Sequence, residues 1–414
     1  MNAPAARAVT VVGVGDDGRA GLSPRALAAI AAARAVAGGA RHLALFPEGA
    51  GERIPLGAGL DGALSRLRDA AAAGPVCVLA SGDPLFFGIG ARVAQAFGAG
   101  AVEFLPQPSS MQWAFARLGI PWDGAALLSC HGRPRDGLVA RLRRRAKAAL
   151  FTDAESPPPA IAAHLLAHGE AGWTAHVCER LGGDRERIRS FRLEALAACE
   201  DVDPLNVLVL VRDAGWRPPP VVPFLPEAAL STRNGLVTKR EVRVVALAAL
   251  RLAEDSVLWD VGAGSGSVSI EAGLLAPEGR VFAVERDAEM LDHLRGNVRR
   301  HGADNVRVVE GSAPGALAGL DTPDAVFVGG SGGDLSAILG RALDALRPGG
   351  RIVVNAALLD TLEEARRLLA ARGLEPEVTL VSVARGAPVA GRLRLDPLAP
   401  VHVVAATTPA GGAR

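Results

Sequence analysis

The residues with the clearest chemical potential lie between positions 260 and 285. Asp260 ends one apolar run, glycines follow at every second position, and Glu285 ends the next apolar run. Glycine lets a ligand approach the backbone closely, and a carboxylate can hold the two hydroxyls of a ribose. The pattern therefore predicts a nucleoside-binding turn made of Gly262, Ala263, Gly264, Ser265 and Gly266.

The glycine spacing separates two kinds of ligand. A dinucleotide fingerprint places its third glycine three residues after the second, where it helps to seat a pyrophosphate. Ser267 occupies that position here. S-adenosylmethionine (SAM) carries no phosphate and needs only close backbone approach, so the spacing favours SAM over a nicotinamide cofactor. The alternative is a glycine turn without any ligand.

The surrounding elements place these residues at one edge of a sheet. The order is a buried strand ending at Asp260, the glycine turn, a helix over SVSIEAGLL and a strand ending at Glu285. A strand with a glycine turn (324–330) and a Pro-Gly-Gly turn with a strand (346–356) follow. This order resembles the class I methyltransferase fold, which is a doubly wound, Rossmann-like α/β sheet.

The amino-terminal half also alternates strands with helices and turns. AVTVVGVGDDG (8–18) predicts a strand and a glycine loop, and a helix is predicted from Ser23 and Pro24 to the glycines at 38–39. PVCVLASGDPLFFG (75–88) predicts a strand that ends in a turn. The proline-rich stretch at 215–227 predicts a linker. We therefore expect α/β domains over 1–213 and 230–408, joined by residues 214–229.

Composition narrows the class of protein. The chain has 414 residues, enough for two domains, and is 49% hydrophobic, which indicates a globular protein. A net charge of +1 provides no field for nucleic acid or a membrane, and no stretch reaches membrane-spanning length. The first ten residues lack the pattern of a secretion signal, and the four cysteines form no CxxC pair. We expect a cytoplasmic enzyme.

Most of the positive charge is arginine, since lysine occurs only at positions 147 and 239. A guanidinium grips carboxylates with two parallel hydrogen bonds, so this composition suits a substrate with several carboxylates. Codon bias in a GC-rich genome is the alternative explanation.

The motif order of the amino-terminal half resembles that of the tetrapyrrole methyltransferases. The motifs are VVGVGDDG (11–18), SGDP (81–84), PSS (108–110), SCHGR (129–133) and ERLGG (179–183). The resemblance implies two α/β lobes with SAM held between them, and its HGR and ERLGG motifs are similar to those of the precorrin C5-methylating branch of cobalamin synthesis. The family usually has Gly-Pro-Gly in its first loop, where this chain has Asp16 and Asp17 before Gly18.

The carboxy-terminal half resembles the precorrin C15-methylating, decarboxylating enzymes. It shares VTKREVR (237–243), the glycine turn, EGSAPGAL (310–317) and VGGSGGDL (328–335) with them. Fused in this order, the two halves resemble the enzymes that methylate precorrin-6B at C5 and C15 and remove the ring C acetate carboxyl, giving precorrin-8. We also expect a homo-oligomer.

The resemblances imply roles for individual residues. In the amino-terminal half, Gly82, Asp83, Ser109 and Ser110 are expected to bind SAM, and Gly13 and Gly15 to face the substrate. In the carboxy-terminal half, Thr238, the turn 262–266, Glu285 and Ala313 are expected to line a second SAM site, with Asp260 holding the turn. The turn formed by Gly329, Gly330, Ser331, Gly332 and Gly333 is expected to admit the flat macrocycle, with Arg243 or Lys239 holding a substrate carboxylate.

Several of these residues have plainer explanations. Asp83 is a candidate base, but an aspartate before proline commonly fixes a turn. His131, beside Arg133, could contact a substrate carboxylate or make a structural hydrogen bond. His164 and His168 lie one helical turn apart, but no third ligand is evident, so no metal is expected.

The sequence leaves some alternatives open. The substrate could be metal-free or cobalt-loaded, and the order of the two methylations is not determined. A methyltransferase acting on another substrate and a non-catalytic SAM-binding scaffold are the rival functions.

Overall fold

The computed structural model describes residues 8–47, 51–57, 59–220 and 224–410. Residues 221–223 of the predicted linker lie outside this part. Contacts divide the chain into two compact units. Unit 1 holds the chain up to Pro134 together with Lys147–Ala162 and Trp173–Asp213, and unit 2 holds Arg135–Ala146, Ala163–Gly172 and the chain from Ala214 onward.

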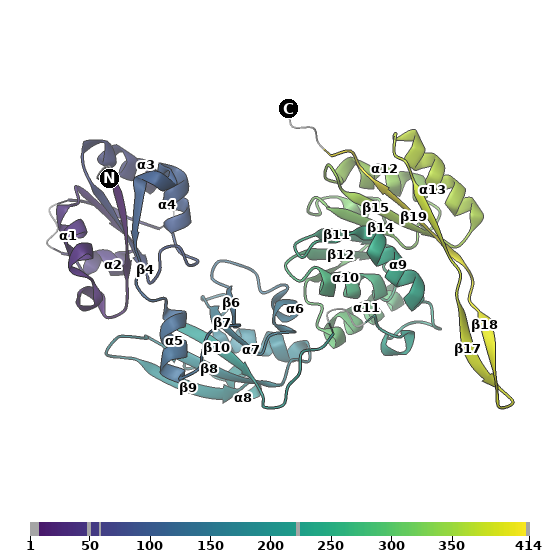
Figure 1. Cartoon of the computed structure of the whole chain (residues 1–414), viewed down its shortest axis with the longest axis horizontal. Coiled ribbons are helices and arrows are strands. Elements are labelled where there is room, and N and C mark those ends of the chain that lie inside the picture. The colour runs from purple at the N-terminus through teal and green to yellow at the C-terminus, as the bar shows by residue number, and fades with distance from the viewer. Residues whose placement is uncertain (1–7, 48–50, 58, 221–223, 411–414) are drawn as a thin grey trace, which may run out of the picture. The chain divides into compact units, whose positions relative to one another are not determined.

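Unit 1 begins with a lobe built on a five-stranded parallel sheet of order β3-β2-β4-β1-β5 (Figure 1). Its central strands are buried on both faces, which explains their continuous apolar runs. The strands are β1 (Val9–Val14), β2 (Ala35–Gly38), β3 (Glu52–Pro55), β4 (Val76–Ser81) and β5 (Val102–Leu105). The helices are α1 (Pro24–Ala32), α2 (Ala40–Ala44), α3 (Leu60–Ala73) and α4 (Gly90–Phe97).

The first predicted helix is too long. Its start is confirmed, because Ser23 Oγ accepts a hydrogen bond from Ala26 N at 3.2 Å and Pro24 is the first helical residue. The helix ends at Ala32, however, and Ala35–Gly38 forms the buried strand β2 between β3 and β4. Small apolar residues fit either element, and pairing with β4 decides the outcome here.

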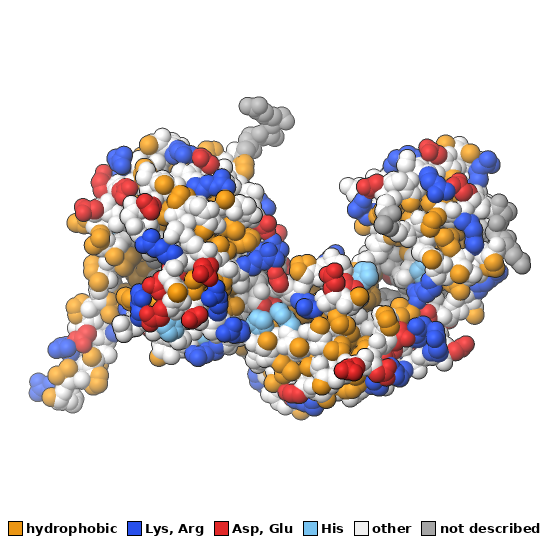
Figure 2. All heavy atoms as spheres, turned by 180° about the vertical axis from the view of Figure 1, so that it is seen from behind, with side chains coloured by type: hydrophobic (Ala, Val, Ile, Leu, Met, Phe, Trp, Pro, Cys, Tyr) orange, Lys and Arg blue, Asp and Glu red, His pale blue; other side chains and the backbone are white. Residues whose placement is uncertain are grey.

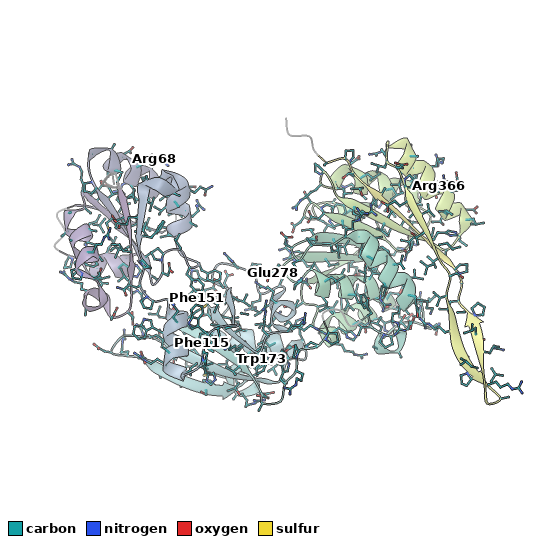
Figure 3. All side chains as sticks on the ribbon, viewed as in Figure 1. Arg68, Phe115, Phe151, Trp173, Glu278 and Arg366 are labelled. Carbon is teal, nitrogen blue, oxygen red and sulfur yellow. The ribbon has the colours of Figure 1, made fainter. Side chains whose placement is uncertain are left out.

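The second lobe of unit 1 is a mixed sheet of order β6-β7-β10-β8-β9. Helix α5 packs on it through Met111, Ala114 and Phe115, and Trp173 is fully buried (Figure 3). The strands are β6 (Ala126–Ser129), β7 (Lys147–Phe151), β8 (Trp173–Glu179), β9 (Arg187–Arg192) and β10 (Asn206–Arg212). The helices are α5 (Ser110–Leu118), α8 (Leu193–Ala197) and the first part of α7 (Pro158–Ala167), whose residues from Ala163 onward belong to unit 2.

Unit 2 is built on a seven-stranded sheet of order β13-β12-β11-β14-β15-β19-β16. The first five strands in this order are parallel, whereas β19 runs antiparallel to both neighbours. This is the predicted doubly wound sheet. The strands are β11 (Val257–Val261), β12 (Arg280–Glu285), β13 (Val306–Glu310), β14 (Ala325–Val328), β15 (Arg351–Ala356), β16 (Glu377–Val381) and β19 (Val401–Thr407).

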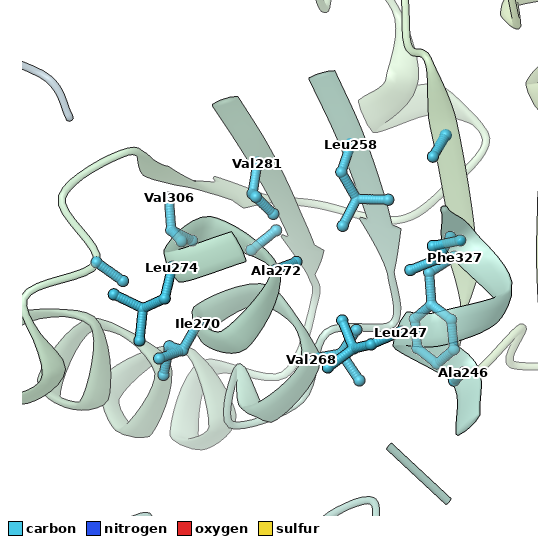
Figure 4. Packing of buried hydrophobic residues seen from close by; sticks show 14 of the residues in the cluster. Ala246, Leu247, Leu258, Val268, Ile270, Ala272, Leu274, Val281, Val306 and Phe327 are labelled. Carbon is cyan, nitrogen blue, oxygen red and sulfur yellow. The ribbon is translucent and has the colours of Figure 1, made fainter. Parts of the chain in front are cut away.

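Helices cover both faces of this sheet. One hydrophobic cluster joins α9, α10 and α11 to one face (Figure 4), and a second joins α12 and α13 to the other. Leu258 and Trp259 of β11 belong to different clusters, because neighbouring side chains of a strand point to opposite faces. The helices are α9 (Arg240–Leu250), α10 (Ser267–Leu275), α11 (Ala288–His301), α12 (Leu335–Ala345) and α13 (Leu359–Ala371).

A two-stranded ribbon extends from the body of unit 2 (Figure 1). It consists of β17 (Ala384–Val389) and β18 (Arg392–Pro397), which pair only with each other among the described strands. Near its base, Arg385 forms ion pairs with Glu227 and Glu241. Side chains of both charge signs are interspersed on the molecular face seen in Figure 2. None of the described helices is long and apolar enough to cross a bilayer.

Two short segments from the amino-terminal half of the sequence belong to unit 2 by their contacts. The first contains α6 (Leu138–Leu142), and the second contains His164. The Asp304 carboxylate accepts hydrogen bonds from Val139 N and Ala140 N and lies 2.9 Å from His164 Nε2. His168 Nδ1 lies 2.9 Å from the His164 carbonyl oxygen. His164 is therefore paired with a carboxylate, and no group of three or more metal-ligating side chains is found in the described ranges.

A fully buried ion pair links α9 to α10. The Arg243 guanidinium donates two hydrogen bonds to the Glu271 carboxylate, at 2.8 and 2.9 Å, and also donates to the carbonyls of Thr238 and Leu225. Neither side chain of the pair is exposed to solvent. Arg243 was predicted to hold a substrate carboxylate, and this prediction is wrong because Glu271 already occupies its fork inside the core.

We expect Arg243→Met to destabilise unit 2 by about 3–5 kcal/mol, since it leaves the Glu271 charge buried without its partner. Arg243→Met combined with Glu271→Leu should recover much of this loss. Urea unfolding of both variants measures the effect, with Arg295→Ala on the exposed face of α11 as the control. An Arg243→Met protein of unchanged stability but weakened substrate affinity would restore Arg243 to the binding site.

Candidate functional site

The candidate site of unit 2 lies where the strand order of the sheet reverses. β12 and β13 lie on one side of β11 and β14 lies on the other, so the loops after these strands separate at this edge. Such a switch point at the carboxyl ends of parallel strands is where doubly wound sheets bind ligands. A cavity of about 210 Å³ is found here, lined by Val261, Gly262, Val284, Glu285, Arg286, Gly311, Ser312, Ala313, Gly330, Ser331, Gly332 and Ile338.

The floor of the cavity depends on a close contact between two loops. Gly262 follows β11 and has φ +72°, and a Cβ added to it would lie 2.4 Å from the Gly330 carbonyl oxygen. A side chain at position 262 would therefore push the loop after β14 away and strain the backbone. The glycine is required by this approach of two backbones as well as by its conformation.

Glu285 organises the turn through backbone hydrogen bonds. Its Oε2 accepts from Gly264 N at 2.8 Å, and its Oε1 accepts from Arg286 N and Asp287 N at 2.8 and 2.9 Å. The side chain is half-buried and lines the cavity. The carboxylate thus ties the end of β12 to the glycine turn after β11, and it keeps lone pairs for a ligand's hydroxyl groups.

Asp260 lies fully buried below the turn. Its pKa is raised to about 7, mainly by burial and to a smaller extent by the nearby Glu285 charge, while the Ser269 hydroxyl of α10 opposes the shift by donating to Oδ2. In the described part of the chain, neither Asp260 Oδ1 nor the buried Ser265 Oγ has a hydrogen-bond partner. Two unpaired polar atoms beside a glycine turn fit a ligand that carries an ammonium group and hydroxyls, as SAM does.

The structure brings most of the predicted residues of this half together. Gly262, Glu285, Ala313, Gly330, Ser331 and Gly332 line the cavity, and Ala263, Gly264, Ser265 and Gly266 complete the turn. Thr238 and Lys239 do not line it. The Thr238 carbonyl accepts from Arg243, and Lys239 Nζ donates to the Gly235 carbonyl at 3.4 Å, in the loop before α9.

Six cavity residues were not among the predicted site residues. Val261, Val284 and Gly311 lie at or beside the carboxyl ends of β11, β12 and β13, and the other three are Arg286, Ser312 and Ile338. Arg286 follows Glu285, Ser312 precedes Ala313, and Ile338 comes from α12. Arg286 and Ser312 adjoin predicted site residues near the carboxyl ends of strands, so the sequence pattern could have indicated them. No such pattern marked Ile338, because it looks like any core residue of a helix.

In unit 1, three predicted residues from separate parts of the sequence converge. A Cβ on Gly13 would lie 2.0 Å from the Gly82 carbonyl oxygen, and a Cβ on Gly82 would lie 3.2 Å from Ser109 Cα. Gly82 has φ +54°, and its carbonyl accepts from Gln107 N. Gly13 was placed in the substrate-facing loop, which is wrong because it is a buried residue of β1. The loops after β1, β4 and β5 therefore meet at one edge.

The polar residues at this edge also hold the local backbone. Ser109 caps α5, where its Oγ accepts from Met111 N and its own N–H donates to the Gln112 side chain. Ser110 is the first residue of this helix. Asp83 Oδ1 accepts from Leu85 N at 2.9 Å, which is the turn-fixing role. A Cβ on Gly15 would lie 2.5 Å from Asp17 Oδ1, so the acidic loop packs on itself.

His131 and Arg133 lie beside a small aromatic cluster. The rings of Phe86, Phe87 and Phe151 meet edge to face at centroid distances of 4.8 to 5.9 Å (Phe151 is labelled in Figure 3). The Arg133 guanidinium lies 5.7 Å from the Phe87 ring centroid. His131 Nδ1 lies 3.3 Å from the Thr152 carbonyl oxygen, so it makes the structural contact that was the alternative to substrate binding.

Unit 1 has a hollow that is larger than the cavity of unit 2 but lies away from the predicted site residues. About 660 Å³ in volume, it is shallow and lies between β3 and α3, with charged residues such as Glu52, Arg66 and Asp69 around it. It contains none of the predicted site residues, and Glu52 and Arg66 pair with each other. Size alone does not make it the site.

Comparison with known families agrees with both halves. Residues 8–197 match the family described as tetrapyrrole (corrin/porphyrin) methylases, and residues 229–408 match the family described as a precorrin methyltransferase domain. The fold and its glycine-lined sites thus define a SAM-dependent methyltransferase with two methyltransferase domains.

Similar curated proteins cover the whole chain or about half of it. Precorrin-6Y C(5,15)-methyltransferase [decarboxylating] of Sinorhizobium sp is 37% identical over 95% of this chain and 94% of its own. The cobalt-precorrin-7 C(5)-methyltransferase of Salmonella typhimurium is 40% identical over 48% of this chain and 98% of its own. The probable cobalt-precorrin-6B C(15)-methyltransferase (decarboxylating) of Pyrobaculum calidifontis is 41% identical over 45% and 97%. The chain belongs to the family of decarboxylating precorrin-6Y C5,15-methyltransferases.

The raised pKa of Asp260 predicts a pH-dependent stability difference. The folded pKa of about 7 exceeds the ordinary value of 3.8, so the contribution of this group to stability is complete below pH 4 and is lost as the pH rises towards 7. Asp260→Asn cannot ionise, so relative to the wild type it should gain on the order of 2–4 kcal/mol between pH 4.5 and pH 7.5. Urea unfolding of the two proteins at both values measures this, with the exposed Asp255→Asn as control. A difference that stays constant with pH would show that Asp260 ionises normally.

Proposed function

We propose that this protein methylates precorrin-6B at C5 and C15 and removes the ring C acetate carboxyl, giving precorrin-8, with SAM as the methyl donor. The meeting of the Gly262 turn, Glu285 and Gly330 at the switch point of the sheet carries the proposal. A tetrapyrrole methylase domain in the same chain, and a relative with both activities in its name, support it. A binding scaffold would not need two methyltransferase folds of different positional class.

SAM binds at two sites in this proposal, one in each domain. In unit 2, Glu285 holds the ribose, the turn 262–266 receives the amino-acid part, and Asp260 and Ser265 supply the unpaired oxygens below it. In unit 1, Gly82 and Ser109 form the floor, because their backbones meet without intervening side chains. In each site the residues that contact SAM also hold the loops that form the pocket.

Positioning is the main task of these residues. SAM supplies an electrophilic methyl group, and its transfer to an electron-rich carbon needs in-line placement more than proton transfer. Loss of the acetate carboxyl breaks a carbon–carbon bond whose electrons enter the conjugated macrocycle as carbon dioxide leaves. The macrocycle is therefore its own electron sink. The glycine turn at 329–333 lets this flat molecule lie close to the backbone, since Ser331 is the only residue of the turn that has a side chain.

The order of reactions follows from the names of the separate enzymes. The C15 enzyme acts on cobalt-precorrin-6B, whereas the C5 enzyme acts on cobalt-precorrin-7. We infer that methylation at C15 with decarboxylation comes first in this chain, and that the amino-terminal domain acts on its product.

The protein's setting is part of the proposal. Three of the four cysteines are buried, and none forms a disulfide in the structure. Thiols outside disulfide bonds fit a reducing, cytoplasmic compartment. A homo-oligomer is part of the same proposal.

Replacing Glu285 tests the second SAM site. Glu285→Ala removes both the ribose acceptor and the carboxylate that fixes Gly264 N, so SAM affinity at this site should fall by about 1–3 kcal/mol. Isothermal calorimetry on the intact chain should then resolve one normal site and one weakened site. Glu310→Ala, at the equivalent end of the neighbouring strand β13, is the control. Two unchanged sites would exclude Glu285 from SAM binding.

A matched pair of glycine variants tests the division of labour. Gly82→Ala and Gly262→Ala both place a Cβ against a neighbouring backbone at a positive φ, so each should block its own domain. With precorrin-6B and labelled SAM, Gly82→Ala should yield a pigment with one new methyl and without the ring C acetate carboxyl, and Gly262→Ala should leave the pigment unchanged. Mass spectrometry reads both outcomes, and thermal unfolding checks that each variant is folded. A decarboxylated pigment from folded Gly262→Ala would place decarboxylation elsewhere.

A further inference from the structure

The carboxy-terminal site needs a cation that neither Arg243 nor Lys239 supplies. A precorrin carries several carboxylates around its macrocycle, and burying one against the protein without a partner is costly. Arg243 is committed to Glu271, and Lys239 lies against Gly235 outside the cavity. Arg286 is the arginine that lines the cavity.

Arg286 reaches from one side of the site to the other. Its backbone follows Glu285 at the end of β12, whereas its guanidinium lies against the loop after β14. A Cβ added to Gly332 would lie 2.7 Å from one guanidinium nitrogen and 3.1 Å from Cζ. The side chain thus crosses the carboxyl end of β11, which lies between these two strands.

The guanidinium is available for a ligand. Across the described ranges, its nitrogens make no ion pair or hydrogen bond, and the adjacent Glu285 carboxylate is held by backbone N–H groups instead. Arg286 is also exposed to solvent, unlike Asp260 and Ser265 below the turn. An unpaired arginine at the rim of a ligand cavity is placed to meet a carboxylate that arrives from solution.

We propose that Arg286 binds a carboxylate of the tetrapyrrole substrate at the mouth of the carboxy-terminal site. A side chain at residue 332, where φ of +59° already favours glycine, would displace the guanidinium. This assignment rests on the function proposed above and adds the residue that orients the macrocycle over the 329–333 turn.

Charge flow identifies which kind of carboxylate this is. The acetate that is lost transfers its negative charge into the macrocycle as carbon dioxide leaves. A guanidinium paired with that acetate would stabilise the starting state more than the transition state and would slow the reaction. Arg286 therefore binds a carboxylate that the product keeps, and it acts as a positioning residue.

The carboxylate of SAM is the other carboxylate that Arg286 could bind. The amino-acid part of SAM is expected at the glycine turn, where Asp260 Oδ1 and Ser265 Oγ lie unpaired and buried. Arg286 instead adjoins the ribose-binding Glu285 and extends over Gly332. The geometry therefore favours the pigment, and the two sources predict different affinities to change.

Carbon dioxide release from precorrin-6B by the intact chain tests the assignment, because it reports the carboxy-terminal domain alone. Arg286→Ala should raise the KM for the pigment about 10-fold or more, with little change in kcat and unchanged SAM affinity in calorimetry. Arg286→Lys should fall between it and the wild type, because it keeps the charge without the fork. Arg295→Ala, whose guanidinium pairs with Asp292 and Glu310 outside the cavity, should behave as the wild type.

Gly332→Ala supplies a second measurement. Its Cβ should displace the guanidinium and raise the KM in the wild-type background but not in Arg286→Ala, which a purely structural effect at residue 332 would not reproduce. An unchanged KM in folded Arg286→Ala would overturn the assignment. If the variant also lost affinity for SAM, Arg286 would be assigned to SAM binding instead of substrate binding. A wild-type chain that releases no carbon dioxide from precorrin-6B would refute the proposed function and this assignment together.

Discussion

Both candidate sites depend on backbones that approach each other with no side chain between them. In unit 2 the loop after β11 touches the loop after β14 at Gly262 and Gly330, and in unit 1 the end of β1 touches the turn after β4 at Gly13 and Gly82. A Cβ at position 13 or 262 would clash severely with the facing carbonyl oxygen, and one at position 82 would crowd Ser109 Cα, because the atoms that it would meet belong to backbone and cannot rotate away. The shape of each site therefore depends on glycines, which have no Cβ to separate the loops.

Such loops need rigid support, and buried polar groups supply much of it in unit 2. Helix α10 is buried along almost its whole length, yet it carries Ser269 and Glu271. Ser269 donates to Asp260 directly below the turn, and Glu271 holds Arg243 of α9. Each of these groups has a partner, so the interior holds charges without leaving them isolated. Asp260 is the exception, since one of its oxygens is unpaired and its pKa is raised to about 7 by burial. Its position beside the proposed SAM pocket gives that exception a functional meaning.

The two domains use the same physical device in unrelated folds. Unit 2 is a doubly wound sheet whose strand order reverses beside β11, whereas the first lobe of unit 1 is a five-stranded parallel sheet joined to a mixed one. Polar side chains near both sites form hydrogen bonds with the backbone. Ser109 caps α5, Asp83 fixes its own turn, and Glu285 accepts from three N–H groups. When a reaction depends on positioning, the residues that fix the loops matter for catalysis alongside the residues that contact the substrate.

The sequence alone determined the doubly wound sheet of unit 2, the glycine turn and the two acidic residues that flank it, because these features depend on local periodicity and on strand ends that neighbouring residues define. It also determined the cap at Ser23 and the start of α1. Only the tertiary structure decided that Ala35–Gly38 is a strand, since pairing with β4 outweighs a weak helical preference. It also removed Arg243 from the site and brought Arg286 into it. An arginine's role depends on which carboxylate lies within reach, and Glu271 is 28 positions away in the sequence while Gly332 is 46 positions beyond Arg286. Long-range contacts of this kind leave no local pattern, so folding itself assigns them.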